Sequence, residues 1–161
     1  IAHVYATQFC QQGAVIDTDL VRWMLRQPHL APWPTDPPDS PAQVQHRLGI
    51  RHSCLLAKSF ISQGFEVGIC DVVGDRLADY YRQQLTGLDF RIALLLPSWE
   101  EALRRLLARP ATISPAEAHL LFDQQQLMSE YDWKLDNTAL SSEAAAAWLH
   151  AQWANAYNEF G

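Results

Sequence analysis

Residues 14–27 read AVIDTDLVRWMLRQ, and this stretch decides the fold class. Its first three residues form a short apolar run typical of a buried strand, Asp17, Thr18 and Asp19 form a polar turn, and residues 20–27 return to helical periodicity. The pattern predicts a strand, a turn and a helix in that order. Polar residues directly after a strand of a parallel sheet are also the first place to look for a ligand site.

The same alternation of strands and helices continues on both sides of this stretch. Further strands are predicted over residues 65–70, 90–96 and 133–135. Helices are predicted over residues 1–12, 42–63, 74–86, 99–109, 115–130 and 141–153. Alternating strands and helices predict an α/β fold in which helices cover both faces of a parallel sheet. The almost continuous apolar run at 90–96 is typical of a strand buried on both faces.

Length and composition indicate a single globular domain over residues 1–161, interrupted by one proline-rich loop. A chain of 161 residues and 18.2 kDa buries roughly two-thirds of its unfolded surface, so it forms a core without disulfides. The loop spans residues 28–41 and holds six prolines, which exclude any regular element there. Long loops in compact domains often carry function.

Charge and cysteine content exclude several classes of protein. The net charge of -6 and pI near 5.4 argue against a nucleic-acid-binding protein, which needs a basic face. Three cysteines without CxxC spacing suggest neither a disulfide framework nor a zinc site, and we expect reduced thiols in a cytoplasmic protein. No apolar run approaches the roughly 20 residues that span a bilayer, so no membrane partner is expected.

Three acidic residues follow predicted strands and are candidates for chemistry. Asp17 and Asp19 follow the strand at 14–16, and Asp71 follows the strand at 65–70. A carboxylate at this edge can orient a hydroxyl, accept its proton, or hold magnesium through water. The plain alternatives are that Asp19 caps the next helix and that Asp71 ends its strand in a turn.

The candidate basic and aromatic residues lie nearby in the predicted order. Arg22 comes one turn after Asp19, where it would meet an anionic group or extend to water. A second group of arginines on the helix at 99–109 either neutralises a phosphoryl group or interacts with the negative end of its own helix. Its members are Arg104, Arg105 and Arg109. Trp33 in the proline-rich loop either covers a substrate or packs the loop down.

Four segments resemble the P-loop kinases that phosphorylate small molecules, the group that includes chloramphenicol phosphotransferase-like, gluconate kinase-like and zeta-toxin-like proteins. In chain order they are IAHVYATQFCQQGAVIDTDLVRWML, FEVGICDVV, FRIALLLPSWEEALRRLLAR and KLDNTALSSEAAAAWL. The first segment resembles the helix after the phosphate-binding loop and the strand that follows it, and the second resembles a Walker B-like strand. The third resembles the strand and arginine-bearing helix before a lid, and the fourth resembles the closing strand and helix. The resemblance implies a lid-like helical region over residues 104–130.

The resemblance also implies roles for the candidate residues. Asp17 or Asp19 would activate or orient the acceptor hydroxyl, Arg22 and Trp33 would bind substrate, and Asp71 would assist magnesium. The residues implied to face the nucleotide phosphates are Arg104, Arg105 and Arg109. The implied cofactors are ATP and Mg²⁺, and the implied partner is a small hydroxylated acceptor.

One strong motif of these kinases, GxxxxGK[ST], does not occur in the 161 residues. We expect a native N-terminal stretch with the first strand and phosphate loop to precede Ile1, and nucleotide affinity to be weak or absent without it. An incomplete parallel sheet leaves unpaired edges, so a homo-oligomer is an expected form. Two alternatives stay open: a non-catalytic nucleotide-fold remnant that acts as a binding module, and a kinase-fold toxin or modifying enzyme with a large acceptor.

Overall fold

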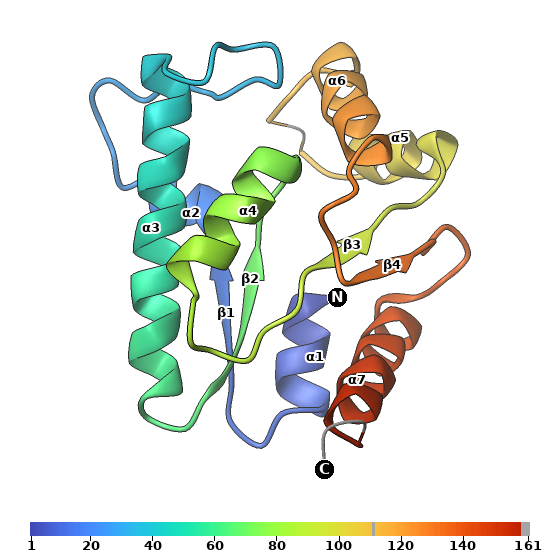
Figure 1. Ribbon diagram of the computed structural model, residues 1–161. Helices are drawn as coiled ribbons and strands as arrows, with labels where there is room; N and C mark the ends of the chain where they lie inside the picture. Colours follow the sequence, from blue (N-terminus) through green and yellow to red (C-terminus); the bar gives the residue numbers. More distant parts are fainter. Residues whose placement is uncertain (111, 159–161) are drawn as a thin grey trace.

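The computed structural model describes residues 1–110 and 112–158 of the predicted domain. Residues 111 and 159–161 lie outside the described residues, and residue 111 belongs to the predicted lid-like region. Strands and helices alternate along the chain (Figure 1). The strands are β1 (Gly13–Asp17), β2 (Glu66–Cys70), β3 (Ala93–Leu95) and β4 (Trp133–Leu135). The helices are α1 (Ala2–Gln8), α2 (Thr18–Arg22), α3 (Pro41–Ile61), α4 (Asp75–Gln84), α5 (Trp99–Leu107), α6 (Pro115–Gln126) and α7 (Ser142–Asn158).

The strands form two parallel pairs instead of one continuous sheet. β1 pairs with β2 from Gly13 opposite Glu66 to Asp17 opposite Cys70, and β3 pairs with β4 in the same parallel sense. Among the described residues no strand joins the two pairs, so β2 and β3 each have one open edge. The predicted α/β class is confirmed, and the sheet is divided into two halves.

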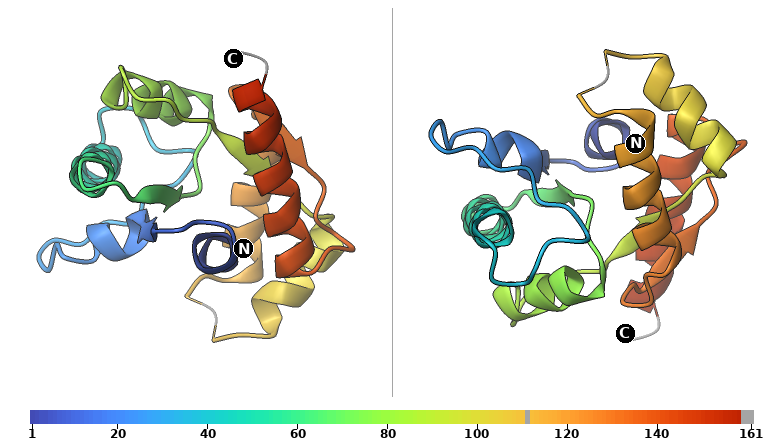
Figure 2. Two further views of the ribbon diagram at one scale, coloured as in Figure 1. Left: turned by 90° about the horizontal axis from the view of Figure 1, so that it is seen from below. Right: turned by 90° about the horizontal axis from the view of Figure 1, so that it is seen from above.

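Helices cover both faces of the β1–β2 pair. α3 packs on one face and α1 on the other, and α1 also contacts α7 (Figure 2). The contact between α1 and β1 is close, because a Cβ atom added to Gly13 would lie 2.3 Å from the carbonyl oxygen of Ala6. Glycine at position 13 therefore allows the helix to approach the strand.

The core lies between α3, α4 and the strands. Ile50 and Cys54 of α3 pack with Leu77 and Ala78 of α4 and with Leu94 of β3. A smaller apolar cluster joins β1 to α2 and α3. The long helix α3 thus connects both halves of the sheet to one core, which places the ends of β1 and β2 beside its first turns.

Some predicted helices and strands were longer than those in the structure. The helix predicted at 20–27 is α2 at Thr18–Arg22, and it begins earlier because the Asp17 side chain accepts hydrogen bonds at its start. The strand predicted at 90–96 is limited to Ala93–Leu95, the residues that pair with β4. The N-caps predicted at Ser98 and Ser114 are confirmed. Among the described helices, none is long and apolar enough to cross a bilayer.

We predict that Ile50→Ala destabilises the protein by about 2–5 kcal/mol, because Ile50 is 0% exposed and the substitution leaves a cavity in the core. Leu55→Ala on the same helix is the matched control, since Leu55 is 55% exposed and should change the free energy of unfolding by about 0.5 kcal/mol or less. Urea denaturation measures both. Equal effects of the two substitutions would contradict this description of the core.

Candidate functional site

The Asp17 carboxylate lies at the carboxyl end of β1 and caps α2. Its Oδ1 accepts hydrogen bonds from the backbone N–H groups of Asp19 at 2.9 Å and Leu20 at 3.4 Å. The expectation that Asp19 is the N-cap was wrong, because α2 begins at Thr18 and this places Asp17 at the cap. The Asp17 side chain is exposed, so one carboxylate oxygen remains open to a ligand at the edge of the sheet.

Arg22 is held inside the protein while its partner Asp19 lies at the surface. The Arg22 Nη1 donates to Asp19 Oδ1 at 2.7 Å and Nη2 donates to the carbonyl oxygen of Leu30 at 3.1 Å. Arg22 is only 6% exposed, and its Nε has no partner within the described residues. Gly49 of α3 makes room for the side chain, because a Cβ there would lie 2.3 Å from Arg22 Cγ.

Asp71 lies at the carboxyl end of β2 in a buried set of hydrogen bonds. The Tyr81 hydroxyl donates to Asp71 Oδ2 at 2.8 Å, and the backbone N–H of Val72 donates to Oδ1 at 2.8 Å. His46 Nε2 lies 3.2 Å from Oδ1 and 3.3 Å from Oδ2. The Asp71 side chain is 6% exposed, so these contacts hold it within the protein.

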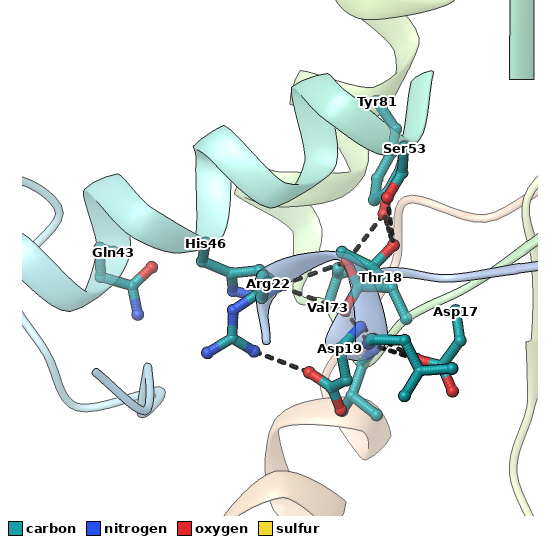
Figure 3. Close-up of polar contacts among 12 residues, drawn as sticks. Asp17, Thr18, Asp19, Arg22, Gln43, His46, Ser53, Val73 and Tyr81 are labelled. Carbon is teal, nitrogen blue, oxygen red and sulfur yellow. Dashed lines mark hydrogen bonds and ion pairs between the residues drawn. The ribbon is translucent and has the colours of Figure 1, made fainter. Parts of the chain in front are cut away.

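Thr18 joins this set to the start of α2 (Figure 3). Its Oγ1 lies 2.9 Å from the Tyr81 hydroxyl and 3.1 Å from Ser53 Oγ, and both Thr18 and Ser53 are fully buried. Burial, followed by the nearby Asp71 charge, holds the pKa of Tyr81 well above its usual range. The Tyr81 hydroxyl therefore stays protonated and serves as a hydrogen-bond donor.

The two strand-end carboxylates lie close to each other. Asp17 pairs in register with Cys70, the residue before Asp71. Burial and then the charges of Asp17 and Asp71 raise the pKa of the Cys70 thiol. Burial also raises the pKa values of Cys10 and Cys54 to about 11, so these thiols are protonated at neutral pH.

Trp33 reaches the same edge of the sheet through the proline-rich loop. Its backbone N–H donates to Asp36 at 2.7 Å, and its carbonyl oxygen accepts from Gln43 Nε2 at 2.9 Å. A small pocket of about 100 Å³ is lined by Trp33, Gln43, His46 and Arg76, together with further residues of the loop, α4 and α6. Because His46 contacts Asp71, the pocket lies beside the buried hydrogen-bond set.

The arginines of the lid-like region are not brought to the acidic residues. Arg104 and Arg105 each donate to Glu101 at 2.6 Å, and Arg105 also donates to the carbonyl oxygen of Asn137 at 2.8 Å. Arg109 is exposed. Within the described residues, no hydrogen bond or ion pair joins these arginines to Asp17, and their predicted contact with nucleotide phosphates stays a prediction.

Four residues of the site were not predicted from the sequence, namely Gln43, His46, Ser53 and Tyr81. The spacing of Gln43, His46 and Ser53 could have identified three of them, because it places these polar side chains on the buried face of α3 together with Ile50. Polar residues on a helix face that meets the core indicate a buried hydrogen-bond network.

Comparisons with protein-family models and with curated protein sequences find no match. Among solved structures, the chain is similar to the tunicamycin resistance protein of Deinococcus radiodurans, with 15% sequence identity and a TM-score of 0.66 over 94% of this chain and 87% of that chain. This likeness confirms an α/β fold with parallel strands and flanking helices. At this identity the likeness concerns the fold alone.

We predict that the free energy of unfolding falls as the pH rises above about 10, the pKa of tyrosine in an unfolded chain. Because the pKa of Tyr81 is raised in the folded state, the folded protein keeps a proton that the unfolded chain releases above this pH. The contribution of Tyr81 to the free energy of unfolding is therefore complete below this pH and decreases above it. In Tyr81→Phe the loss should be smaller by about 1.4 kcal/mol per pH unit. Tyr5, whose pKa burial raises to about 12, contributes equally to both proteins. Identical slopes in urea denaturation from pH 9 to 11.5 would contradict this assignment.

We predict that Gly49→Ala destabilises the protein because the added methyl group displaces the buried stem of Arg22. In an Arg22→Ala background the same change should stabilise α3 by up to about 1 kcal/mol, since alanine is the better helix former. The double-mutant cycle isolates this contact, and urea denaturation measures it. Additive effects would show that Gly49 does not position Arg22.

Proposed function

We propose that the protein transfers a phosphoryl group from ATP to a hydroxyl group of a small-molecule acceptor. The supporting observation is the gathering of Asp17, Arg22 and Asp71 at the carboxyl ends of two paired parallel strands. Ligands of open parallel sheets bind at this edge. The fold likeness is to a protein named for resistance to a small molecule, which supports an acceptor of that class.

Asp17 is the best candidate for the group that activates the acceptor. Its carboxylate is exposed, and its capping bonds use Oδ1 alone, whereas Asp19 is paired with Arg22. In the proposed step Asp17 Oδ2 accepts the hydroxyl proton, the acceptor oxygen bonds to the γ-phosphorus, and the bond from that phosphorus to ADP breaks. Arg22 would stay near the site as a fixed positive charge that favours an anionic group.

The pocket below the proline-rich loop is the proposed place for the acceptor. Trp33 supplies an apolar surface, and Gln43 and Arg76, which share a hydrogen bond of 3.0 Å, supply polar groups. Its small volume of about 100 Å³ means that the loop must move or the acceptor must extend outward. We therefore propose that the proline-rich loop and the start of α3 determine which acceptor binds.

Magnesium is expected to arrive with the ATP phosphates. Both oxygens of Asp71 already accept hydrogen bonds or contact His46, so direct coordination by Asp71 does not fit this arrangement. Among the described residues, no group of three or more acidic, histidine or cysteine side chains forms a metal site. The magnesium role of Asp71 stays a prediction, and we propose that Asp71 mainly fixes the end of β2. A cytoplasmic location is part of the same proposal.

A binding module without catalysis is the second candidate. It is favoured by the absence of GxxxxGK[ST] from the 161 residues, since that motif supplies the backbone and lysine contacts to phosphates in this fold. In this alternative Arg22 and the acidic turn bind a partner and no bond is formed or broken. A homo-oligomer is compatible with both candidates.

We predict that Asp17→Asn lowers phosphoryl transfer by about 10²-fold or more, because the amide cannot accept the hydroxyl proton. The assay follows transfer from radiolabelled ATP to a panel of hydroxylated small molecules, with the protein expressed with its natural upstream coding sequence. Asp79→Asn is the matched control, since Asp79 is an exposed carboxylate of α4 that does not line the pocket and should leave transfer unchanged.

Circular dichroism must show the same fold for both variants. Transfer that is unchanged in Asp17→Asn would contradict the catalytic role of Asp17. No transfer by the unsubstituted protein to any acceptor, together with no protection by ATP against heat, would favour the binding module.

A further inference from the structure

The pocket at Trp33 has a histidine in its wall and lies apart from the proposed base. Its described lining includes His46, Gln43 and Arg76 but not Asp17. Gln43 and His46 project from the same side of α3 (Figure 3). An acceptor whose reacting hydroxyl meets Asp17 therefore needs a second part that enters the pocket, and His46 is available to contact that part.

Asp71 fixes the orientation of the His46 ring. The ring nitrogen Nε2 lies 3.2 Å from Oδ1 and 3.3 Å from Oδ2 of Asp71. The Tyr81 hydroxyl and the Val72 backbone N–H hold this carboxylate in turn. An ionised carboxylate accepts hydrogen bonds and donates none, so Nε2 carries the proton. In the neutral ring the other nitrogen, Nδ1, is then an acceptor with a free lone pair.

Nδ1 is the nitrogen of His46 that a ligand can reach. Among the described residues, the hydrogen bonds of His46 run through Nε2. Within that part of the chain, the buried side-chain atoms without a partner are Arg22 Nε and Asn137 Oδ1, so Nδ1 has some exposed surface. Nε2 points to Asp71, which is not among the described residues of the pocket. The pocket therefore lies on another side of the ring.

The neighbouring polar groups do not offer a comparable acceptor. Gln43 donates to a carbonyl oxygen of the proline-rich loop at 2.9 Å, and its own side-chain oxygen accepts from Arg76 at 3.0 Å. Both carboxylate oxygens of Asp75 accept hydrogen bonds from residues 129–130. The Gln124 amide also lines the pocket, but no described hydrogen bond holds it in place. The free ring nitrogen is thus the acceptor that the structure fixes in position.

An unprotonated nitrogen selects a ligand group that carries a hydrogen. Hydroxyl and ammonium groups both donate, but a buried charge is costly unless it is paired. Arg76 and Asp75 both line the pocket and balance each other in charge, so a neutral group fits it best. Trp33 and Pro34 add apolar contacts. These walls favour a hydroxyl group on a small apolar frame.

We propose that His46 is a specificity-determining residue whose Nδ1 accepts a hydrogen bond from a second hydroxyl group of the acceptor. The acceptor class is a small diol or polyol in which one hydroxyl lies in the pocket and another reaches Asp17. Asp71 acts as the positioning residue for the ring. This inference rests on the proposed function for the role of Asp17, whereas the hydrogen bond to His46 is a property of binding alone.

The test is an NMR titration of the ¹⁵N-labelled protein, expressed with its natural upstream coding sequence. The two probes are resorcinol, which carries two hydroxyl groups on one ring, and its monomethyl ether, which cannot donate from the second oxygen. The test variant is His46→Gln, because its amide can still donate to Asp71 but has no acceptor at the position of Nδ1. The matched control is Gln124→Ala, which removes the other side-chain acceptor of the pocket.

We expect the unsubstituted protein to bind resorcinol about 5-fold more tightly than the ether, the effect of one net hydrogen bond. The His46 Nδ1 resonance should be that of an unprotonated nitrogen, and resorcinol should shift it. In His46→Gln the two affinities should be nearly equal, whereas Gln124→Ala should keep the preference for resorcinol. Urea denaturation checks that both variants remain folded.

Four results would overturn the proposal. They are the absence of saturable resorcinol binding, equal affinities for the two probes in the unsubstituted protein, a preference that persists in folded His46→Gln, and an Nδ1 resonance that shows a bound proton. Transfer of phosphate from ATP to resorcinol is measured separately. A preference that depends on His46 without any transfer would support this inference and contradict the proposed function, so the two failures are distinguishable.

Discussion

The buried hydrogen bonds to Asp71 are the constraint on which the candidate site depends. Asp71 ends β2, His46 lies on α3 and Tyr81 lies on α4, while Thr18 connects Tyr81 to the start of α2. One carboxylate thus fixes the relative positions of three helices and two strand ends. Since leaving a buried carboxylate without partners costs a large part of a domain's stability, the network holds these elements together in one arrangement.

β2 connects this network to the divided sheet. One of its edges pairs with β1, its last residue precedes Asp71, and its other edge borders an apolar cleft. β2 is therefore held by β1 along one edge and by the hydrogen bonds to Asp71 at its carboxyl end. α3 is the longest helix described, and its Ile50 and Cys54 pack in one cluster with Leu94 of β3.

The sequence was sufficient for the order of elements and for the positions of the strand-end acids. Apolar runs located all four strands, and Ser98 and Ser114 located two helix starts, because these depend on neighbouring residues. The N-cap of α2 was predicted at Asp19 instead of Asp17, since a cap depends on where the helix begins. The contact of His46 with Asp71 and the burial of Arg22 against Gly49 join residues 25 and 27 positions apart, and periodicity within one element carries no information about such contacts. The division of the sheet is likewise a property of tertiary structure.

The central claim is that the acidic edge at the carboxyl ends of β1 and β2 belongs to a phosphoryl-transfer site. The most direct measurement is an NMR titration of the protein, expressed with its natural upstream coding sequence, with an ATP analogue that cannot be hydrolysed. The account predicts that the largest chemical-shift changes fall at the backbone amides of residues 17–22 and 71–72, at the ends of the two strands. Changes confined to other residues would contradict it.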